Sequence, residues 1–371
     1  MLLSSVSVTP QCQFIQASYA SDERSKTVFQ RILLPLDGST RAERAISVAA
    51  RLAHASGGSV IFVRVVNKSS GFWPFLAEYT TLVQQALAAD LAEAERYLAG
   101  VATSPELEGI PIESMVQCGP TVSTIIATAD ASGADLIVMC SHGYSGLTCR
   151  IMGSVAEKLA REVSVPVLVL REDGPVPGKG DRDAARPLRI LVPLDGSAHA
   201  KAVLEPAAAL LAALAGSTPG VLHLLHVVEL VTADIEEGGM LTASAKARRY
   251  LSTTAEHIRE GYVASTVAQL NLDITWSVAV DTSVAKTLIR TAENVEASEG
   301  DEMLGDYDVI ALATHGRDGL QRWVMGSVTE QVLRDTKLPL LVVPPHGQRM
   351  PASAEVRKYM KRFVPSSLIS G

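Results

Sequence analysis

Apolar residues along the chain form short continuous runs that alternate with longer runs of mixed apolar and polar positions. The short runs, such as Leu136 to Met139, are apolar at nearly every position, which is typical of parallel strands covered by helices on both faces. This alternation indicates an α/β fold. In the first half of the chain it predicts strands at 31–36, 59–66, 112–117, 135–140 and 165–170, and helices at 40–55, 78–99, 121–132 and 154–162.

The same unit occurs twice. The residues from Arg31 to Ser39 (RILLPLDGS) return 158 positions later as RILVPLDGS, and Met152 to Val155 (MGSV) returns 173 positions later at Met325. The second copy is therefore about fifteen residues longer, and much of the gain falls in an acidic stretch from Glu293 to Asp306. We predict two tandem, open-sheet, Rossmann-like α/β domains, each with a five-stranded parallel sheet.

Composition divides the rest of the chain. We predict an N-terminal extension at 1–29, a first domain at 30–171, a linker at 172–187, a second domain at 188–345 and a C-terminal tail at 346–371. The linker is rich in Gly, Pro and charge, which predicts that it does not pack. Residues 356–364 of the tail place their apolar side chains on one helical face, which predicts an amphipathic helix that docks on its own domain or on a partner or membrane.

Composition also narrows the function classes. The chain has 371 residues, of which 47% are hydrophobic, enough for two globular cores. Its formal charge of −7 disfavours broad nucleic-acid binding. The four cysteines form no metal-binding or disulfide pattern, which favours the cytoplasm. No apolar run is long enough to span a membrane, and the first twenty residues lack the basic segment of a signal peptide.

An aspartate stands at the tip of the first strand of each copy, in Pro35-Leu-Asp37-Gly-Ser and in Pro193-Leu-Asp195-Gly-Ser. Ligands of open α/β sheets bind beyond the carboxyl ends of the strands. A carboxylate there can accept hydrogen bonds from a base or ribose; the alternative is that it only braces the turn. Thr40 with Glu43 predicts a capping box on the helix that follows.

A second motif follows the fourth strand of each copy, where a His-Gly pair is separated by nine residues from a Gly-Ser pair. These pairs are His142-Gly143 with Gly153-Ser154, and His315-Gly316 with Gly326-Ser327. Glycine allows close approach to the backbone, and a helix start presents free N–H groups to phosphate. Each Ser-x-x-Glu also predicts a capping box, so an ordinary capped helix is the alternative. The two motifs together favour a nucleotide site.

These residues, in this order and at this spacing, resemble the universal stress protein family, here as a tandem covering about residues 30–345. The resemblance implies an adenine-nucleotide α-hydrolase-like fold and a site for ATP, with any Mg²⁺ arriving on the nucleotide. In nucleotide-binding members a G-x2-G-x9-G-[ST] pattern cradles phosphates and ribose, the strand-one Asp contacts adenine and a strand-two Val lines the base pocket. Carried over by position, the implied residues are Pro35, Asp37, Val65, Gly143, Gly153, Ser154 and Val155, then Pro193, Asp195, Val227, Gly316, Gly326, Ser327 and Val328.

Both copies depart from that pattern at its first glycine, which is Cys140 in one and Ala313 in the other. The bulkier Cys140 is expected to narrow the ribose-phosphate corner, so the second site is favoured for ATP. Cys140 itself is either a redox-active thiol or, as is commoner, a buried small apolar group. His223 and His226 lie three apart on a predicted strand and face opposite sides, so they do not chelate one metal.

The hypothesis that follows is an ATP-binding stress-response module that acts by ligand-dependent conformation or pairing, without dedicated catalysis. Members of the family dimerise through the last strand. The resemblance therefore implies an intramolecular pseudo-dimer that pairs 165–170 with 338–343, and a possible homodimer of whole chains. Two alternatives remain open. One is an interaction scaffold that does not bind nucleotide, and the other is a weak ATP hydrolase.

Overall fold

The structure is a computed structural model. It describes residues 29–67, 80–141, 152–172, 174–178, 186–216, 218–230, 239–262, 272–293, 306–314 and 325–344, and the structural statements below concern these residues. Both tails, including the predicted helix at 356–364, lie outside them, as do positions 294–305 of the acidic stretch.

The first copy follows the predicted order of strands and helices. Its elements are β1 (Arg31–Pro35), α1 (Thr40–Ser56), β2 (Ser59–Val66), α2 (Thr80–Val101), the 3-10 turn η3 (Pro105–Leu107), β3 (Ile112–Cys118), α3 (Thr121–Ser132), β4 (Leu136–Cys140), α4 (Ser154–Glu162) and β5 (Val167–Leu170). The last strand begins two residues later than predicted, directly after Pro166, because proline has no N–H to donate to a neighbouring strand.

The second copy repeats this order with one local change. Its elements are β6 (Arg189–Pro193), the 3-10 turn η4 (Ala200–Val203), α5 (Leu204–Ala215), β7 (Gly220–Glu229), α6 (Gly239–Arg259), β8 (Leu272–Asp281), α7 (Val284–Glu293), β9 (Val309–Ala313), α8 (Ser327–Asp335) and β10 (Leu340–Val343). The first helix is divided here because Pro206 cannot donate to the carbonyl four residues before it. A proline is tolerated only in the first turn of α5.

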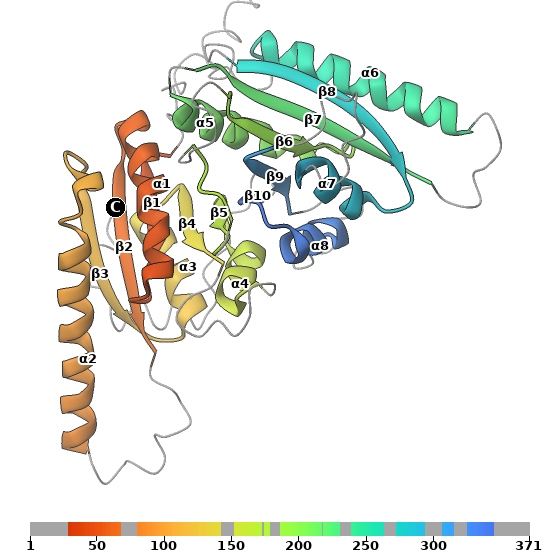
Figure 1. The fold of residues 1–371 in the computed structure, drawn as a ribbon. Helices are drawn as coiled ribbons and strands as arrows, with labels where there is room; N and C mark the ends of the chain where they lie inside the picture. Colours follow the sequence, from red (N-terminus) through yellow and green to blue (C-terminus); the bar gives the residue numbers. More distant parts are fainter. Residues whose placement is uncertain are drawn as a thin grey trace, which may run out of the picture.

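The ten strands form one sheet, in the order β3-β2-β1-β4-β5-β10-β9-β6-β7-β8 (Figure 1). The α/β class and the parallel pairing within each copy agree with the sequence, and the pairing of 165–170 with 338–343 that the resemblance implies is present between β5 and β10. Through this pairing the two predicted five-stranded sheets form one sheet of ten strands. The last strands join the halves because β5 and β10 pair antiparallel, with Leu168 opposite Leu341. Both are apolar and fully buried, and an unpaired strand of this kind would leave its backbone groups without partners.

The antiparallel joint turns the two halves in opposite directions. Strands β1 and β4 are parallel to each other, as are β6 and β9. Because β5 runs against β10, the carboxyl ends of the strands in the first copy lie on the opposite edge of the sheet from those in the second. Any pair of equivalent sites at those ends therefore opens at two different edges of the molecule.

Helices cover both faces of the sheet, and each apolar layer runs through both copies. One layer gathers buried residues of α1, α2, α5 and α6, among them Leu52, Leu98, Leu211 and Leu251. The other gathers those of α3, α4, α7 and α8, among them Ile125, Leu159, Leu288 and Val332. The continuous core explains why the central strands β4, β5, β9 and β10 are apolar at every position.

The linker packs in part, contrary to the prediction from its composition. Arg44 of α1 donates to the carbonyl of Gly174 (2.9 Å), and Arg51 donates to those of Pro177 (2.7 Å) and Leu214 (2.5 Å). A guanidinium can satisfy several carbonyls of a segment that has no regular structure. Arg51 thereby ties α1 both to the linker and to the carboxyl end of α5 in the other copy.

A second arginine crosses the joint. Arg171, just after β5, is buried and donates to the carbonyl of Leu333 in α8. Burial lowers the pKa of Arg171 to about 10, so its guanidinium stays charged at neutral pH. A cation at the carboxyl end of a helix is favourable. No helix of the part of the chain described by the structure is both long and apolar enough to cross a membrane.

We expect Leu168→Ala, at the centre of the joint, to lower the free energy of unfolding by about 2–5 kcal/mol, since it removes a fully buried side chain. Urea denaturation followed by circular dichroism measures the change. Leu241→Ala, at a site that is 70% exposed, is the matched control and is expected to stay within about 0.5 kcal/mol. Equal effects of the two substitutions would contradict the central place of the joint.

Candidate functional site

The strand order reverses beside β1, which lies between β2 and β4. Such a switch point is where open α/β sheets bind ligands. The turn after β1 is closed by Asp37, whose Oδ1 accepts hydrogen bonds from the Ser39 N–H (3.0 Å) and hydroxyl (2.6 Å). Gly38 between them has φ 89°, a conformation that favours glycine. One carboxylate oxygen of Asp37 therefore braces the turn.

Ser39 caps α1, since its Oγ accepts a hydrogen bond from the Ala42 N–H at 3.2 Å. The predicted capping box of Thr40 and Glu43 is wrong by one residue, because Thr40 is already helical. The second copy repeats the turn. There Asp195 accepts from the Ser197 N–H at 2.8 Å, and Ser197 Oγ accepts from the Ala200 N–H.

A recess of about 180 Å³ opens beside the first turn. It is lined by Asp37, Arg64, Val65, Val66, Asp90 and Glu93. Two implied site residues, Asp37 and Val65, thus share one hollow, because β2 is the parallel neighbour of β1. The Arg64 side chain lies against the turn: a Cβ on Gly38 would stand 2.9 Å from Arg64 Nη1.

The recess has four members that the sequence did not point to, of which Val66 continues β2 beyond Val65. Asp90 and Glu93 are exposed residues of α2, and neither stands in a motif. Arg64 adjoins the implied Val65, and its guanidinium lies 4.8 Å from the ring centre of Tyr97. Helical periodicity would have placed both carboxylates on the outer side of α2. Their meeting with Asp37 required the tertiary structure.

The starts of α4 and α8 differ from the predicted capping boxes. In each, the N-cap is the glycine, Gly153 or Gly326, and the serine that follows is already the first helical residue. No side chain caps either helix. The exposed hydroxyls of Ser154 and Ser327 therefore point out from the first turn instead of closing it. The Ser-x-x-Glu spacing predicted the serine as the N-cap, but in each helix the N-cap is the residue directly before that serine.

Each of these glycines is fastened to the end of the fourth strand of its copy. The Gly153 N–H donates to the Ser141 carbonyl (2.8 Å), and the Gly326 N–H donates to that of Thr314 (2.9 Å). The helix start and the strand end are thereby held together at the switch-point edge. Gly143 and Gly316, with His142 and His315, fall in the intervening segments outside the described residues.

Neither N-cap glycine is demanded by its backbone conformation. Gly153 has φ −63° and Gly326 has φ −58°, values that any residue adopts. Among the described residues, a Cβ built on Gly326 would meet only the Thr314 carbonyl oxygen, at an ordinary 3.6 Å. The described part of the fold would therefore accept a side chain at position 326.

The remaining implied residues are placed by packing. Val155 and Val328 are half-buried and pack on the core layer beneath α4 and α8, and Val65 and Val227 pack on the same layer. Pro35 and Pro193 end β1 and β6 and are also half-buried. These side chains support the site edge, whereas the polar groups that reach solvent are the aspartates and serines.

Cys140 ends β4 as expected, but its side chain belongs to the core layer that contains α1. Burial raises the pKa of the Cys140 thiol to about 11, so the thiol is protonated at neutral pH. The expectation that Cys140 narrows the corner beside the helix start is not supported by this placement. Its character is that of a small apolar residue.

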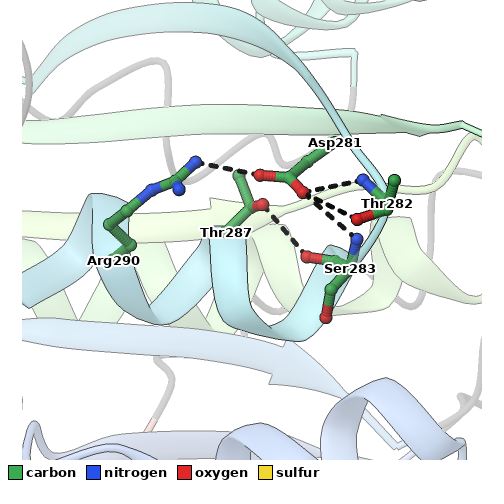
Figure 2. Close-up of polar contacts among 5 residues, drawn as sticks. All are labelled: Asp281, Thr282, Ser283, Thr287 and Arg290. Carbon is green, nitrogen blue, oxygen red and sulfur yellow. Dashed lines mark hydrogen bonds and ion pairs between the residues drawn. The ribbon is translucent and has the colours of Figure 1, made fainter.

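A polar cluster stands at the end of β8, where the first copy has Gly119 (Figure 2). Asp281 accepts hydrogen bonds from the N–H groups of Thr282 (2.7 Å) and Ser283 (3.3 Å), and it forms an ion pair with Arg290 (2.9 Å). The pKa of Asp281 is lowered to about 2, first by the nearby Thr287 hydroxyl and then by the Ser283 N–H. The Thr287 hydroxyl itself donates its hydrogen bond to the Ser283 carbonyl. The cluster braces the turn that leads from β8 into α7.

The histidines of β7 face opposite layers, as their spacing predicted. His223 lies between the hydroxyls of Thr275 (2.7 Å) and Ser277 (2.8 Å), and burial lowers its pKa to about 4. His226 instead meets the ring of Tyr250, 6.3 Å away. In the described ranges no group of three or more His, Cys, Asp or Glu residues is arranged to hold a metal ion.

Fold and site together define a duplicated α/β protein in which each copy carries a switch point at the carboxyl ends of its strands. The profile of the universal stress protein family matches residues 29–171 and 188–344. The chain therefore belongs to the universal stress protein family, as a tandem member.

Individual relatives agree. A universal stress protein of Thermus aquaticus is 32% identical over 145 residues, which is 39% of this chain and 100% of the relative. One from Mycobacterium tuberculosis is 24% identical over 323 residues, which is 84% of this chain and 96% of the relative. A solved structure of a functionally unknown protein from Pseudomonas aeruginosa superimposes with a TM-score of 0.54 at 19% identity, covering 91% of this chain and 98% of that one. The last similarity supports the two-copy fold alone.

We expect Asp281→Asn to lower the melting temperature at pH 7. Because the folded pKa of about 2 lies below the ordinary 3.8, the carboxylate stabilises the folded state above about pH 4, and this contribution is lost as the pH falls from about 4 to 2. The difference between parent and variant should therefore shrink over that interval in thermal melts. Asp273→Asn, at an exposed position of the same strand, is the control. A difference that is independent of pH would contradict a charge-dependent cap.

Proposed function

We propose that this universal stress protein binds an adenine nucleotide, ATP in the first instance, at the carboxyl edge of the sheet, and that occupancy changes the conformation or pairing of its two halves. It requires no dedicated catalytic group. The phosphates would lie at the start of α8 in the second copy, and at the start of α4 for a nucleotide bound to the first copy. The base would lie toward the aspartate turn and the β2 or β7 valine. Any Mg²⁺ would be carried by the nucleotide.

The observation that carries this proposal is the glycine at each helix start. Position 326 has room for a Cβ and a backbone that any residue adopts, so folding does not explain the glycine. Close approach of a ligand to the backbone does explain it. The first hydrogen bond within α8 runs from the Glu330 N–H to the Gly326 carbonyl. The N–H groups of residues 327–329 in the first turn therefore have no carbonyl of the helix to bond and are available to an anion.

The aspartate turn supports the same location for the base. Asp37 and Val65 line a common recess, and Asp195 closes the equivalent turn of the second copy. A single copy of the motif would be explained by a structural turn. The recurrence of turn, glycine and exposed serine in both copies favours a ligand over that alternative.

The backbone offers a short connection from site to joint. The Gly153 N–H bonds to Ser141, and the Ser141 N–H donates to the Leu170 carbonyl at 2.7 Å. Leu170 ends β5, the strand that pairs with β10. Thr314 makes the equivalent bond to Val343, at 2.9 Å. A ligand that shifts a helix start would therefore act on the strands that join the two halves.

The protein would act in the cytoplasm. The two cysteines among the described residues, Cys118 and Cys140, are both free thiols, which suits a reducing compartment. Assembly of whole chains into a homodimer remains part of the proposal.

We expect the double variant Gly153→Val/Gly326→Val to bind ATP at least about tenfold more weakly than the parent, because the branched side chains cover the helix-start N–H groups. Isothermal titration calorimetry measures the affinity. Gly100→Val is the matched control, since it makes the same exchange on α2 where a Cβ meets nothing within 4 Å. Circular dichroism checks that both variants fold. Failure of the parent to bind ATP would leave the scaffold alternative, and steady turnover of ATP would favour the hydrolase.

A further inference from the structure

The two copies surround an equivalent tyrosine with side chains of different charge. Tyr97 of α2 and Tyr250 of α6 are equivalent, because the buried residues that flank them coincide. These are Ala94 and Leu98 in the first copy and Ala247 and Leu251 in the second. The Tyr97 hydroxyl donates to the Glu43 carboxylate at 3.0 Å, and the Arg64 guanidinium covers the ring.

In the second copy Lys201 replaces Glu43 and His226 replaces Arg64. The Lys201 ammonium lies 5.2 Å from the centre of the Tyr250 ring, and His226 meets that ring edge-on. The tyrosine is thus held in both copies, but a carboxylate and a guanidinium hold it in one, whereas an ammonium and an imidazole hold it in the other.

The reversal extends to the rim of the recess. Asp90 and Glu93 share the recess with Asp37, and the flanking tyrosines align them with Ala243 and Lys246. The five aligned positions, taken in the order 37, 43, 64, 90 and 93, hold four carboxylates and one guanidinium, a formal charge of −3. Their counterparts hold one carboxylate, two ammonium groups, an alanine and a neutral histidine, a formal charge of +1.

We infer that the two sites are not equivalent: the second copy binds the nucleotide with its polyphosphate, and the carboxylates around the first-copy recess exclude it. The chain therefore holds one ATP, and the first copy admits only ligands that carry little negative charge. This inference rests on the proposed nucleotide binding and assigns that binding to the site of the second copy.

The exclusion is electrostatic. ATP brings several negative charges, and Asp90 and Glu93 are both exposed on the helix that borders Asp37. Asp90 and Glu93 border the base end of the proposed site, and because repulsions from several carboxylates add, they disfavour the approach of a multiply charged anion. In the second copy Lys201 and Lys246 supply attraction at the matching positions. The formal charge of −7 belongs to the whole chain and gives no preference between the copies, so the local groups decide.

The first test counts binding sites. Titration of the full chain with ATP should give one site per chain, which Gly326→Val removes. Two sites of equal affinity in the parent, or a site of parental affinity that survives Gly326→Val, would overturn the inference while leaving nucleotide binding intact. Failure of the parent to bind any ATP would overturn the proposed function, and the inference with it.

The second test reverses the charge of the first recess. We expect Asp90→Ala/Glu93→Lys to raise ATP affinity of the first copy at least about tenfold, so that a second site appears in the titration. Glu95→Lys is the matched control, because it removes a carboxylate from the same helix outside the recess lining and should leave the count at one. In the second copy, Lys246→Glu should weaken ATP more than adenosine, which carries no phosphate. Equal weakening of both ligands would contradict an effect of charge.

Discussion

The antiparallel pairing of β5 with β10 is the contact on which the rest of the molecule depends. Each strand is short and apolar, and each would be the exposed edge of its own half. Pairing satisfies their backbone groups, continues the sheet and merges the apolar layers of the two copies. Arg51 and Arg171 then add hydrogen bonds to helix ends across the joint.

The same pairing decides how the candidate sites relate to each other. Antiparallel strands place the two carboxyl edges on opposite sides of the sheet, so two ligands would not share a cavity. Communication between them would have to pass through the backbone hydrogen bonds that link each helix start to the central strands. These hydrogen bonds connect each helix start to the strands that join the two copies.

Duplication preserved the backbone features of the site and changed its side chains. The aspartate turns and glycine helix starts agree closely in the two copies. Around Tyr97 and Tyr250, by contrast, nearly every charged neighbour differs. The two copies thus share the backbone features of the switch point and differ in the charged side chains around it.

The sequence by itself determined the α/β class, the duplication, the order of the elements and the two strand-end motifs, because periodicity, turn residues and repeats are properties of neighbouring positions. It placed the N-caps one residue too late, because the Ser/Thr-x-x-Glu spacing pointed to the first helical residue as the cap. The pairing of β5 with β10 was implied by the family resemblance, but only the tertiary structure decided that the two apolar layers run through both copies, that the linker packs on α1, and that Asp90 and Glu93 line the same recess as Asp37. These depend on contacts between distant segments, whose partners no local pattern specifies.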